Sequence, residues 1–306
     1  MEQYPQTIME FERDFSTEEA CLEYIYRLRW PEGFRCPRCG SSEAWKTGRG
    51  LYHCKQCQHQ SSVTAGTIFQ DTRKPLRLWF RAIWYITNQK HGISALGLQR
   101  LLGLGSYHTS WFWMHKLRHA MVRPGRDRLS GIVEVDETYI GGERPGKRGR
   151  GAAGKTLVVI AAQEDDKRIG RIRILRVSDT SANSLTGAVQ ACIEPGSVVR
   201  TDGLRSYGQL DTLGYKHTVA RKEAVIGENP LPLVNRVASL LKRWLLGTHQ
   251  GAVQISHLDY YLDEFTFRFN RRRSRSRGKL FYRLVQQAVI VDPLPGSSIG
   301  IKEHIG

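Results

Sequence analysis

The pattern of apolar and polar positions divides the chain into a helical first part and a mixed second part. Residues 15–30 open with a Ser-Thr-Glu-Glu helix start and continue with helical apolar spacing. Further stretches with helical spacing follow at 74–86, 92–102 and 107–121. A polar segment with Gly and Pro, residues 123–130, then predicts a domain boundary.

Beyond this boundary the spacing becomes typical of strands. Strands are predicted at 132–136, 156–163, 169–177, 197–201 and 215–220. Helices are predicted at 181–193, 234–246 and 257–269. In a mixed sheet with this element order, the first and fourth strands can lie side by side, so the second part is expected to form an α/β domain.

The charge of the chain indicates which class of partner it binds. The 306 residues include 46 Lys and Arg against 29 Asp and Glu, a formal net charge of +17, and 40% of residues are hydrophobic. The chain can therefore build a core, and its basic surplus indicates a polyanionic partner such as nucleic acid; the alternative is a basic protein without one. Apolar runs are too short to span a bilayer and the N-terminus lacks signal-peptide features, so we expect a cytoplasmic protein with no membrane partner.

Four of the six cysteines form two Cys-x-x-Cys pairs: Cys36, Cys39, Cys54 and Cys57. Two such pairs separated by a short ribbon are typical of a tetrahedral structural zinc site. His53 and His59 flank the second pair and are alternative ligands. The other cysteines, Cys21 and Cys192, lie in apolar helical surroundings and are interpreted as small buried residues.

The three helical stretches from 74 to 122, with a Gly-bearing turn at 103–105, have the order of a helix-turn-helix. Lys116 and Arg118, on the last of these helices, are then expected to contact DNA phosphates. The alternative is an ordinary three-helix bundle.

Two acids stand where strands end. Asp136 ends the first predicted strand, and Asp202 follows the fourth. If these strands are neighbours, the two carboxylates meet at one sheet edge and repel each other unless cations lie between them. Oxygen ligands favour Mg²⁺ or Mn²⁺, and paired ions at such a site can support phosphodiester cleavage in a ribonuclease-H-like arrangement. The alternative for either aspartate is a turn residue.

Several stretches resemble the ISXO2-like transposases of the IS1595 family, namely VEVDETYIGG, RTDGLRSYGQL, LPLVNRVASLLKRWLLGTHQG and the upstream TAGTIFQDTRKPLRLWFRAIW. The resemblance covers roughly residues 15–275. It implies a transposase of an insertion sequence that binds double-stranded DNA at the element's terminal inverted repeats and catalyses metal-dependent strand cleavage and transfer to target DNA. It also implies that Asp136 and Asp202 are the first two metal-binding acids. A homodimer or larger assembly on DNA is expected, because two element ends must be served.

The expected fold class is therefore α+β and multidomain. Its parts are an N-terminal helical segment at 1–33, a zinc ribbon at 34–62, a helix-turn-helix-like domain at 74–122, a ribonuclease-H-like catalytic domain at 131–275 and a flexible tail at 292–306.

The third catalytic position has two candidates. Many strand-transfer enzymes of this fold carry Glu on a helix after the second Asp, but here that helix offers Asn235, whose amide oxygen can bind Mg²⁺. Glu264 is the alternative carboxylate, although an ion pair with Arg268 at i,i+4 spacing also explains it. Glu134 has the strand parity of the first aspartate and is a further possible metal neighbour, whereas Glu137 is expected on the opposite face.

Basic residues around the second part are expected to hold DNA phosphates, although such runs are often solvated faces. They are Lys147 and Arg148 in a Gly-rich loop, Lys242 and Arg243 on the helix of Asn235, and Arg271, Arg272 and Arg273 after the last predicted helix. Two other functions stay open: an inert zinc-ribbon DNA-binding regulator derived from a transposase, and a nuclease that cuts without joining.

Overall fold

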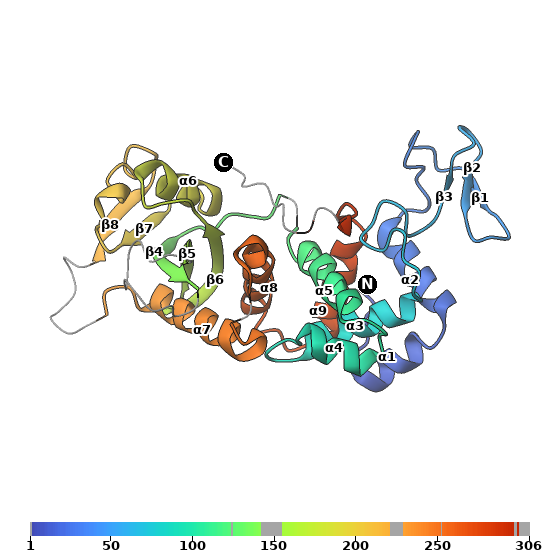
Figure 1. Ribbon diagram of the computed structural model, residues 1–306. Helices are drawn as coiled ribbons and strands as arrows, with labels where there is room; N and C mark the ends of the chain where they lie inside the picture. Colours follow the sequence, from blue (N-terminus) through green and yellow to red (C-terminus); the bar gives the residue numbers. More distant parts are fainter. Residues whose placement is uncertain are drawn as a thin grey trace. The chain divides into compact units, whose positions relative to one another are not determined.

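A computed structural model describes residues 2–123, 125–141, 155–220, 229–251, 253–296 and 299 (Figure 1). The chain divides into two compact units. Unit 1 comprises Met1–Pro124 and Arg273–Ile299, and unit 2 centres on Gly125–Arg272. None of the helices in the described part of the chain combines the length and apolar character that a membrane span requires.

Unit 1 consists of helices and a small antiparallel ribbon. Its helices are α1 (Ile8–Asp14), α2 (Glu18–Arg29), α3 (Leu76–Asn88), α4 (Ala95–Leu102), α5 (Tyr107–Ala120) and α9 (Arg277–Ala288). The ribbon strands are β1 (Ala44–Lys46), β2 (Tyr52–Cys54) and β3 (Gln60–Ser61), in the order β1-β2-β3.

An aromatic cluster holds the helices of unit 1 together. The ring of Phe281, on α9, lies 5.4 Å from the rings of Phe11 and Phe15 and 5.6 Å from that of Phe80. All four side chains are buried. The core of unit 1 is thus completed by a helix from the far end of the chain, which the sequence analysis did not predict.

Aromatic stacking and one arginine attach the ribbon to α2. The ring of Tyr52, on β2, stacks on Tyr26 of α2 at 5.1 Å and on Phe34 at 5.5 Å. Arg29, at the end of α2, donates hydrogen bonds to the carbonyl oxygens of Ser62 and Val63. These contacts supply the apolar packing that so short a ribbon cannot make by itself.

Unit 2 is built on a five-stranded mixed sheet in the order β6-β5-β4-β7-β8. The strands are β4 (Ile132–Ile140), β5 (Thr156–Asp165), β6 (Arg168–Arg176), β7 (Val198–Thr201) and β8 (Lys216–Val219). The first three pair antiparallel, whereas β4 with β7 and β7 with β8 pair parallel. The predicted adjacency of the first and fourth strands is therefore confirmed.

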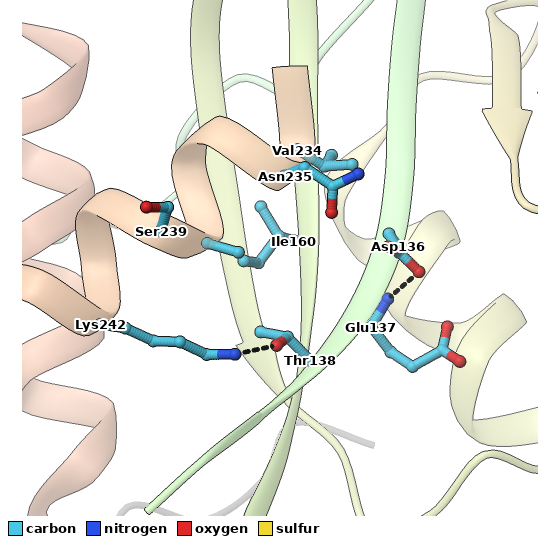
Figure 2. A pocket seen from close by; sticks show the side chains of 9 residues that line it. Asp136, Glu137, Thr138, Ile160, Val234, Asn235, Ser239 and Lys242 are labelled. Carbon is cyan, nitrogen blue, oxygen red and sulfur yellow. Dashed lines mark hydrogen bonds between the residues drawn. The ribbon is translucent and has the colours of Figure 1, made fainter. Parts of the chain in front are cut away.

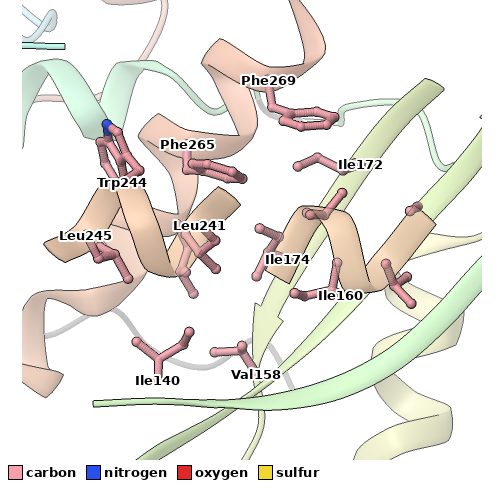
Figure 3. Packing of buried hydrophobic residues seen from close by; sticks show 14 of the residues in the cluster. Ile140, Val158, Ile160, Ile172, Ile174, Leu241, Trp244, Leu245, Phe265 and Phe269 are labelled. Atoms are coloured by element: carbon pink, nitrogen blue, oxygen red, sulfur yellow. The ribbon is translucent and has the colours of Figure 1, made fainter. Parts of the chain in front are cut away.

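Helices cover both faces of this sheet. They are α6 (Ala182–Cys192), α7 (Pro232–His249) and α8 (Leu258–Asn270), with short 3-10 helices η1 (Arg205–Tyr207) and η3 (Ile255–His257). On one face, which we call the α7 face, Leu241 and Trp244 of α7 and Phe265 of α8 pack on Ile160 and Ile174 of the sheet (Figure 3).

The opposite face packs against α6. Val133 and Val135 of β4 join Leu185 of α6 and Tyr207 of η1 in a second buried cluster. Because successive strand residues point to opposite faces, the even-numbered positions of β4 belong to the α7 face. This alternation decides which acids of the strand can face α7.

Candidate active site and metal centre

The four paired cysteines meet at one end of the ribbon. The Sγ atoms of Cys36 and Cys57 lie 3.6 Å apart, as do those of Cys39 and Cys54, and all four lie within 4.8 Å of one another. Tetrahedral zinc with Zn–S bonds near 2.3 Å separates its sulfur ligands by about 3.8 Å. The four sulfurs therefore fit a structural zinc ion.

Backbone amides favour the thiolate form that a zinc ligand needs. The amide of Cys57, followed in effect by that of Gln56, lowers the pKa of Cys54 to about 6, against the opposing effect of burial. His53 stacks on Trp45 and hydrogen-bonds Gln58 instead of joining the sulfurs. Of the described residues, only the four cysteines form a group of three or more Cys, His, Asp or Glu side chains able to share a metal.

Asp136 lies on β4, and Asp202 lies just beyond the neighbouring parallel strand. Glu134 of β4 pairs with Arg200 of β7, and β7 ends at Thr201, so Asp202 is the first residue after that strand. The sequence analysis expected Asp136 to end its own strand, but β4 continues to Ile140, so Asp136 lies within it. Both aspartates are close enough to Tyr207 for their charges to raise the pKa of its hydroxyl. The adjacency of the two strands is confirmed, whereas the meeting of the two carboxylates stays a prediction.

Backbone hydrogen bonds orient both carboxylates. Oδ1 of Asp136 accepts from the amide of Glu137 at 2.9 Å, and Oδ1 of Asp202 accepts from the amide of Leu204 at 2.9 Å. The pKa of Tyr207 is raised first by burial and further by the negative charges of Glu137 and both aspartates. Its hydroxyl stays protonated and donates to Glu137 at 3.2 Å, which joins η1 to β4.

A cavity of about 390 Å³ opens between β4 and α7 (Figure 2). Its walls are Asp136, Glu137, Thr138, Ile160, Val234, Asn235, Ala238, Ser239 and Lys242. Three of the predicted site residues, Asp136, Asn235 and Lys242, thus share one space. Asp202 does not line this cavity and directly follows the adjacent strand, β7.

Asn235 faces Asp136 from the first turn of α7 (Figure 2). Its Nδ2 donates to Oδ1 of Asn229 at 2.7 Å. This bond uses the amide nitrogen and leaves the amide oxygen as the group that can bind a cation. The side chain is exposed, so solvent or a ligand can reach it.

Lys242 stands two turns further along α7. Its Nζ donates to Oγ1 of Thr138 at 2.7 Å, which keeps the ammonium beside β4. Partial burial, followed by the charge of Lys155, lowers the pKa of Lys242. Arg243, the next residue, is exposed.

Glu134 has a different role from the one considered in the sequence analysis. Its side chain is 3% exposed, and Oε2 accepts from the amides of Leu233 at 2.7 Å and Val234 at 3.0 Å. The carboxylate therefore caps α7 instead of standing beside a metal. The parity argument gave the correct face but could not identify backbone amides as the partners.

Glu264 is excluded as a third metal ligand. It is 0% exposed, and Oε1 lies 2.8 Å from Nε of Arg268 on the same helix. The ion-pair interpretation is confirmed, because the i,i+4 spacing satisfies the carboxylate inside the protein. The other candidates from the sequence analysis, Asp136, Asp202 and Asn235, offer only oxygen donors, which suit Mg²⁺ or Mn²⁺.

The predicted phosphate contacts on α5 are wrong. Lys116 is 8% exposed and donates from Nζ to the carbonyl oxygen of Ile68 at 3.1 Å, and Arg118 is 1% exposed. Large apolar residues occur all around this helix, so its basic side chains are enclosed with them.

Two arginines after α8 are half-buried and take part in packing. Arg272 stacks on Phe269 at 4.0 Å and donates to the carbonyl oxygens of Ile169 and Gly170, which joins α8 to β6. Arg271 stacks on Phe267 at 4.0 Å. Among the other predicted contacts, Arg273 is exposed, whereas Lys147 and Arg148 lie outside the described residues.

The sequence analysis missed Thr138, Ser239 and Tyr207 as parts of this site. Thr138 shares the parity of Asp136, which is the signal that could have found it. Ser239 lies four residues after Asn235 on the same helix face. Tyr207 carries no local signal, because it reaches Glu137 only through the fold.

Comparisons with known proteins place two parts of the chain. Residues 128–270 match the ISXO2-like transposase domain, and residues 16–60 match the transposase zinc-ribbon domain. Over 290 residues the chain is 28% identical to an uncharacterized protein in transposable element ISH50 from Halobacterium salinarum. The aligned region covers 87% of this chain and 95% of that protein.

Solved structures give weaker likenesses. A chain in the simian T-cell lymphotropic virus intasome in complex with PP2A regulatory subunit B56 gamma has a TM-score of 0.32 at 15% identity, over 60% of this chain and 70% of that chain. A chain in a pre-cleavage Mos1 transpososome has a TM-score of 0.26 at 12% identity, over 72% and 79%. Both TM-scores are too low to bear on the fold.

Proposed function

Because this chain belongs to the IS1595 family of transposases, we propose that it cleaves DNA strands at the ends of an insertion sequence and joins them to target DNA. The observation that carries the proposal is the parallel pairing of β4 with β7, since Asp136 lies on β4 and Asp202 directly follows β7. Asn235, across the cavity from Asp136, is proposed as the third member of the site.

The sheet topology supports a ribonuclease-H-like catalytic unit. Three antiparallel strands, β4 to β6, continue into the parallel strands β7 and β8, with helices on both faces. In this order the first strand is central and lies next to the fourth. Asp136 on β4 and Asp202 directly after β7 are then proposed to act together although 66 residues separate them in the chain.

The residues at this edge suit a divalent cation. Asp136 and Asp202 would hold it through carboxylate oxygens and Asn235 through its amide oxygen. Bound there, Mg²⁺ or Mn²⁺ would supply Lewis-acid chemistry, polarising a phosphodiester and activating a water or a 3′-hydroxyl for in-line attack. A neutral amide is a weaker ligand than a carboxylate, so the two aspartates are expected to dominate affinity.

Basic residues of α7 are proposed to hold the DNA strand. An ammonium has three donors, and Lys242 uses one for Thr138, so the others can reach phosphate oxygens in the same cavity. Arg243 is exposed on the same helix. Both would fix the strand by its backbone, independent of base sequence.

Unit 1 is proposed to recognise the terminal repeats through the ribbon and a helix-turn-helix formed by α4 and α5. Gly103 ends α4 in the left-handed region, with φ of 61°, and Ser106 caps α5. This turn is compatible with the motif. Since Lys116 and Arg118 are buried, contacts must come from other residues. We further propose a dimer or larger assembly on DNA, because two element ends must be joined.

The test is a cleavage and strand-transfer assay on duplexes carrying the element's ends, with Mg²⁺ or Mn²⁺. Wild type is compared with Asp202→Ala, Asn235→Ala and Asp211→Asn. Asp211 lies in the turn segment after Asp202, and its Oδ1 accepts a hydrogen bond from the amide of His217, which Asn can also do. Loss of several kcal/mol of metal-assisted stabilisation should reduce joining by about 10³-fold or more in Asp202→Ala, and Asp211→Asn should retain activity.

One observation favours a second candidate function. The third position is an amide, and no third carboxylate joins the two aspartates in the described part of the chain. A zinc-loaded, folded protein that binds element ends but never cuts them would be an inert regulator. Cleavage without joined products would instead indicate a nuclease.

A further inference from the structure

The N-terminus of α7 is capped by a residue from a distant strand. The position before the helix is Leu231, whose side chain makes no capping hydrogen bond. The amides of Leu233 and Val234 would then be without acceptors within the helix, and Glu134 of β4 accepts both. A carboxylate at this end also interacts favourably with the helix dipole.

This cap lies directly beside the candidate active site. Glu134 is two residues before Asp136 on the α7 face, and its partner Val234 immediately precedes Asn235. Two residues after Asp136 on the same face, Thr138 accepts from Lys242. Hydrogen bonds between β4 and α7 thus stand on both sides of Asp136.

We propose that Glu134 is a positioning residue, which fixes the first turn of α7 and thereby holds the Asn235 side chain opposite Asp136. The hold on α7, by which we mean the two hydrogen bonds from its first turn to Glu134, is argued from geometry alone. Its consequence for catalysis rests on the proposed function. Capping α7 requires two features of the Glu134 side chain: an oxygen that accepts hydrogen bonds, and enough length to bring that oxygen to the amides.

Hydrogen exchange of the full-length, zinc-loaded protein tests the hold on α7. Glu134→Ala should raise the exchange rate of residues 231–236. Glu134→Asp should do the same, because it keeps the charge but is one methylene too short. Glu134→Gln should retain most of the protection, because it keeps the acceptor. Asp259→Asn is the matched control: Asp259 pairs with Arg176 of β6 in the same unit and should leave this segment unchanged.

Mn²⁺ titration followed by electron paramagnetic resonance tests the link to Asn235. Glu134→Asp and Asn235→Ala should each weaken binding, by up to about 10–100-fold as for other residues that support a metal ligand. The double variant should bind no worse than the weaker single variant. Multiplied losses would overturn the link, and unchanged exchange in Glu134→Asp would overturn the hold itself. Wild type without Mn²⁺ affinity would count against the proposed function, while the exchange result would still decide the role of Glu134.

Discussion

At the scale of single residues, the turn after Asp202 depends on Gly203. This residue has φ of 89°, and an added Cβ would lie 2.6 Å from Cγ1 of Val219 on β8. Gly203→Ala should therefore lower the free energy of unfolding by about 1–3 kcal/mol, through backbone strain and the clash. It should also displace the carboxylate of Asp202, which hydrogen-bonds across this turn.

Urea unfolding followed by circular dichroism measures the effect. Gly187→Ala is the control, since Gly187 lies within α6 with nothing within 4 Å of its added Cβ. Helix propensity should make that variant more stable, by up to about 1 kcal/mol. Equal unfolding midpoints for Gly203→Ala and wild type would contradict the argument.

Residue roles differ in how far the sequence determines them. The adjacency of β4 and β7, which carry or precede Asp136 and Asp202, could be predicted from the order of the elements. The capping role of Glu134 could not, since the donors to its carboxylate are backbone amides 99 and 100 residues away. Side-chain type and parity identify a face, but only the fold identifies the partner.

At the scale of elements, α9 is expected to be essential to unit 1. Phe281 is fully buried among the rings of α1 and α3. Phe281→Ala should lower the free energy of unfolding of this unit by about 3–5 kcal/mol, because truncation leaves a cavity in a packed aromatic cluster. Ile290→Ala, just beyond α9 and 62% exposed in wild type, should change it by less than about 0.5 kcal/mol.

Thermal unfolding of both variants, with zinc content measured in each, distinguishes the two outcomes. A Phe281→Ala protein that melts with wild type would show that α9 adds little to unit 1. The sequence analysis did not predict α9. Its apolar positions have helical spacing, but they directly follow a run of arginines that was interpreted as a DNA-binding segment; these positions are Leu280, Phe281, Leu284 and Val285.

The stability of the ribbon is expected to depend on bound zinc. Its strands have two or three residues each and bury few side chains, so the four cysteines must supply its stability through zinc. Chelation should release one zinc ion per chain and abolish hydrogen-exchange protection across residues 36–61. The sheet of unit 2 should keep its protection, because its two clusters do not involve the ribbon. Loss of protection in both units would contradict this independence.

At the scale of the whole molecule, the net charge of +17 does not determine which basic side chains are accessible to a partner. Two basic residues that the sequence presents as phosphate contacts, Lys116 and Arg118, are buried, and a third, Arg272, is half-buried and stacks on Phe269. A basic composition therefore predicted the class of partner but not the residues that meet it. Long basic side chains with apolar stems are readily incorporated into packing.

The salt dependence of DNA binding separates global from local charge. If Arg243 contacts a phosphate, Arg243→Gln should reduce the slope of log K against log salt by about one, as expected for one released counterion. Arg168→Gln makes the same change in net charge but lies on the edge strand β6, away from β4, and should leave the slope unchanged. Equal slopes of log K against log salt in both variants would mean that Arg243 contributes only to the overall electrostatic field of the protein. A difference confined to Arg243→Gln would place the DNA backbone along α7, beside the cavity of Asp136 and Asn235.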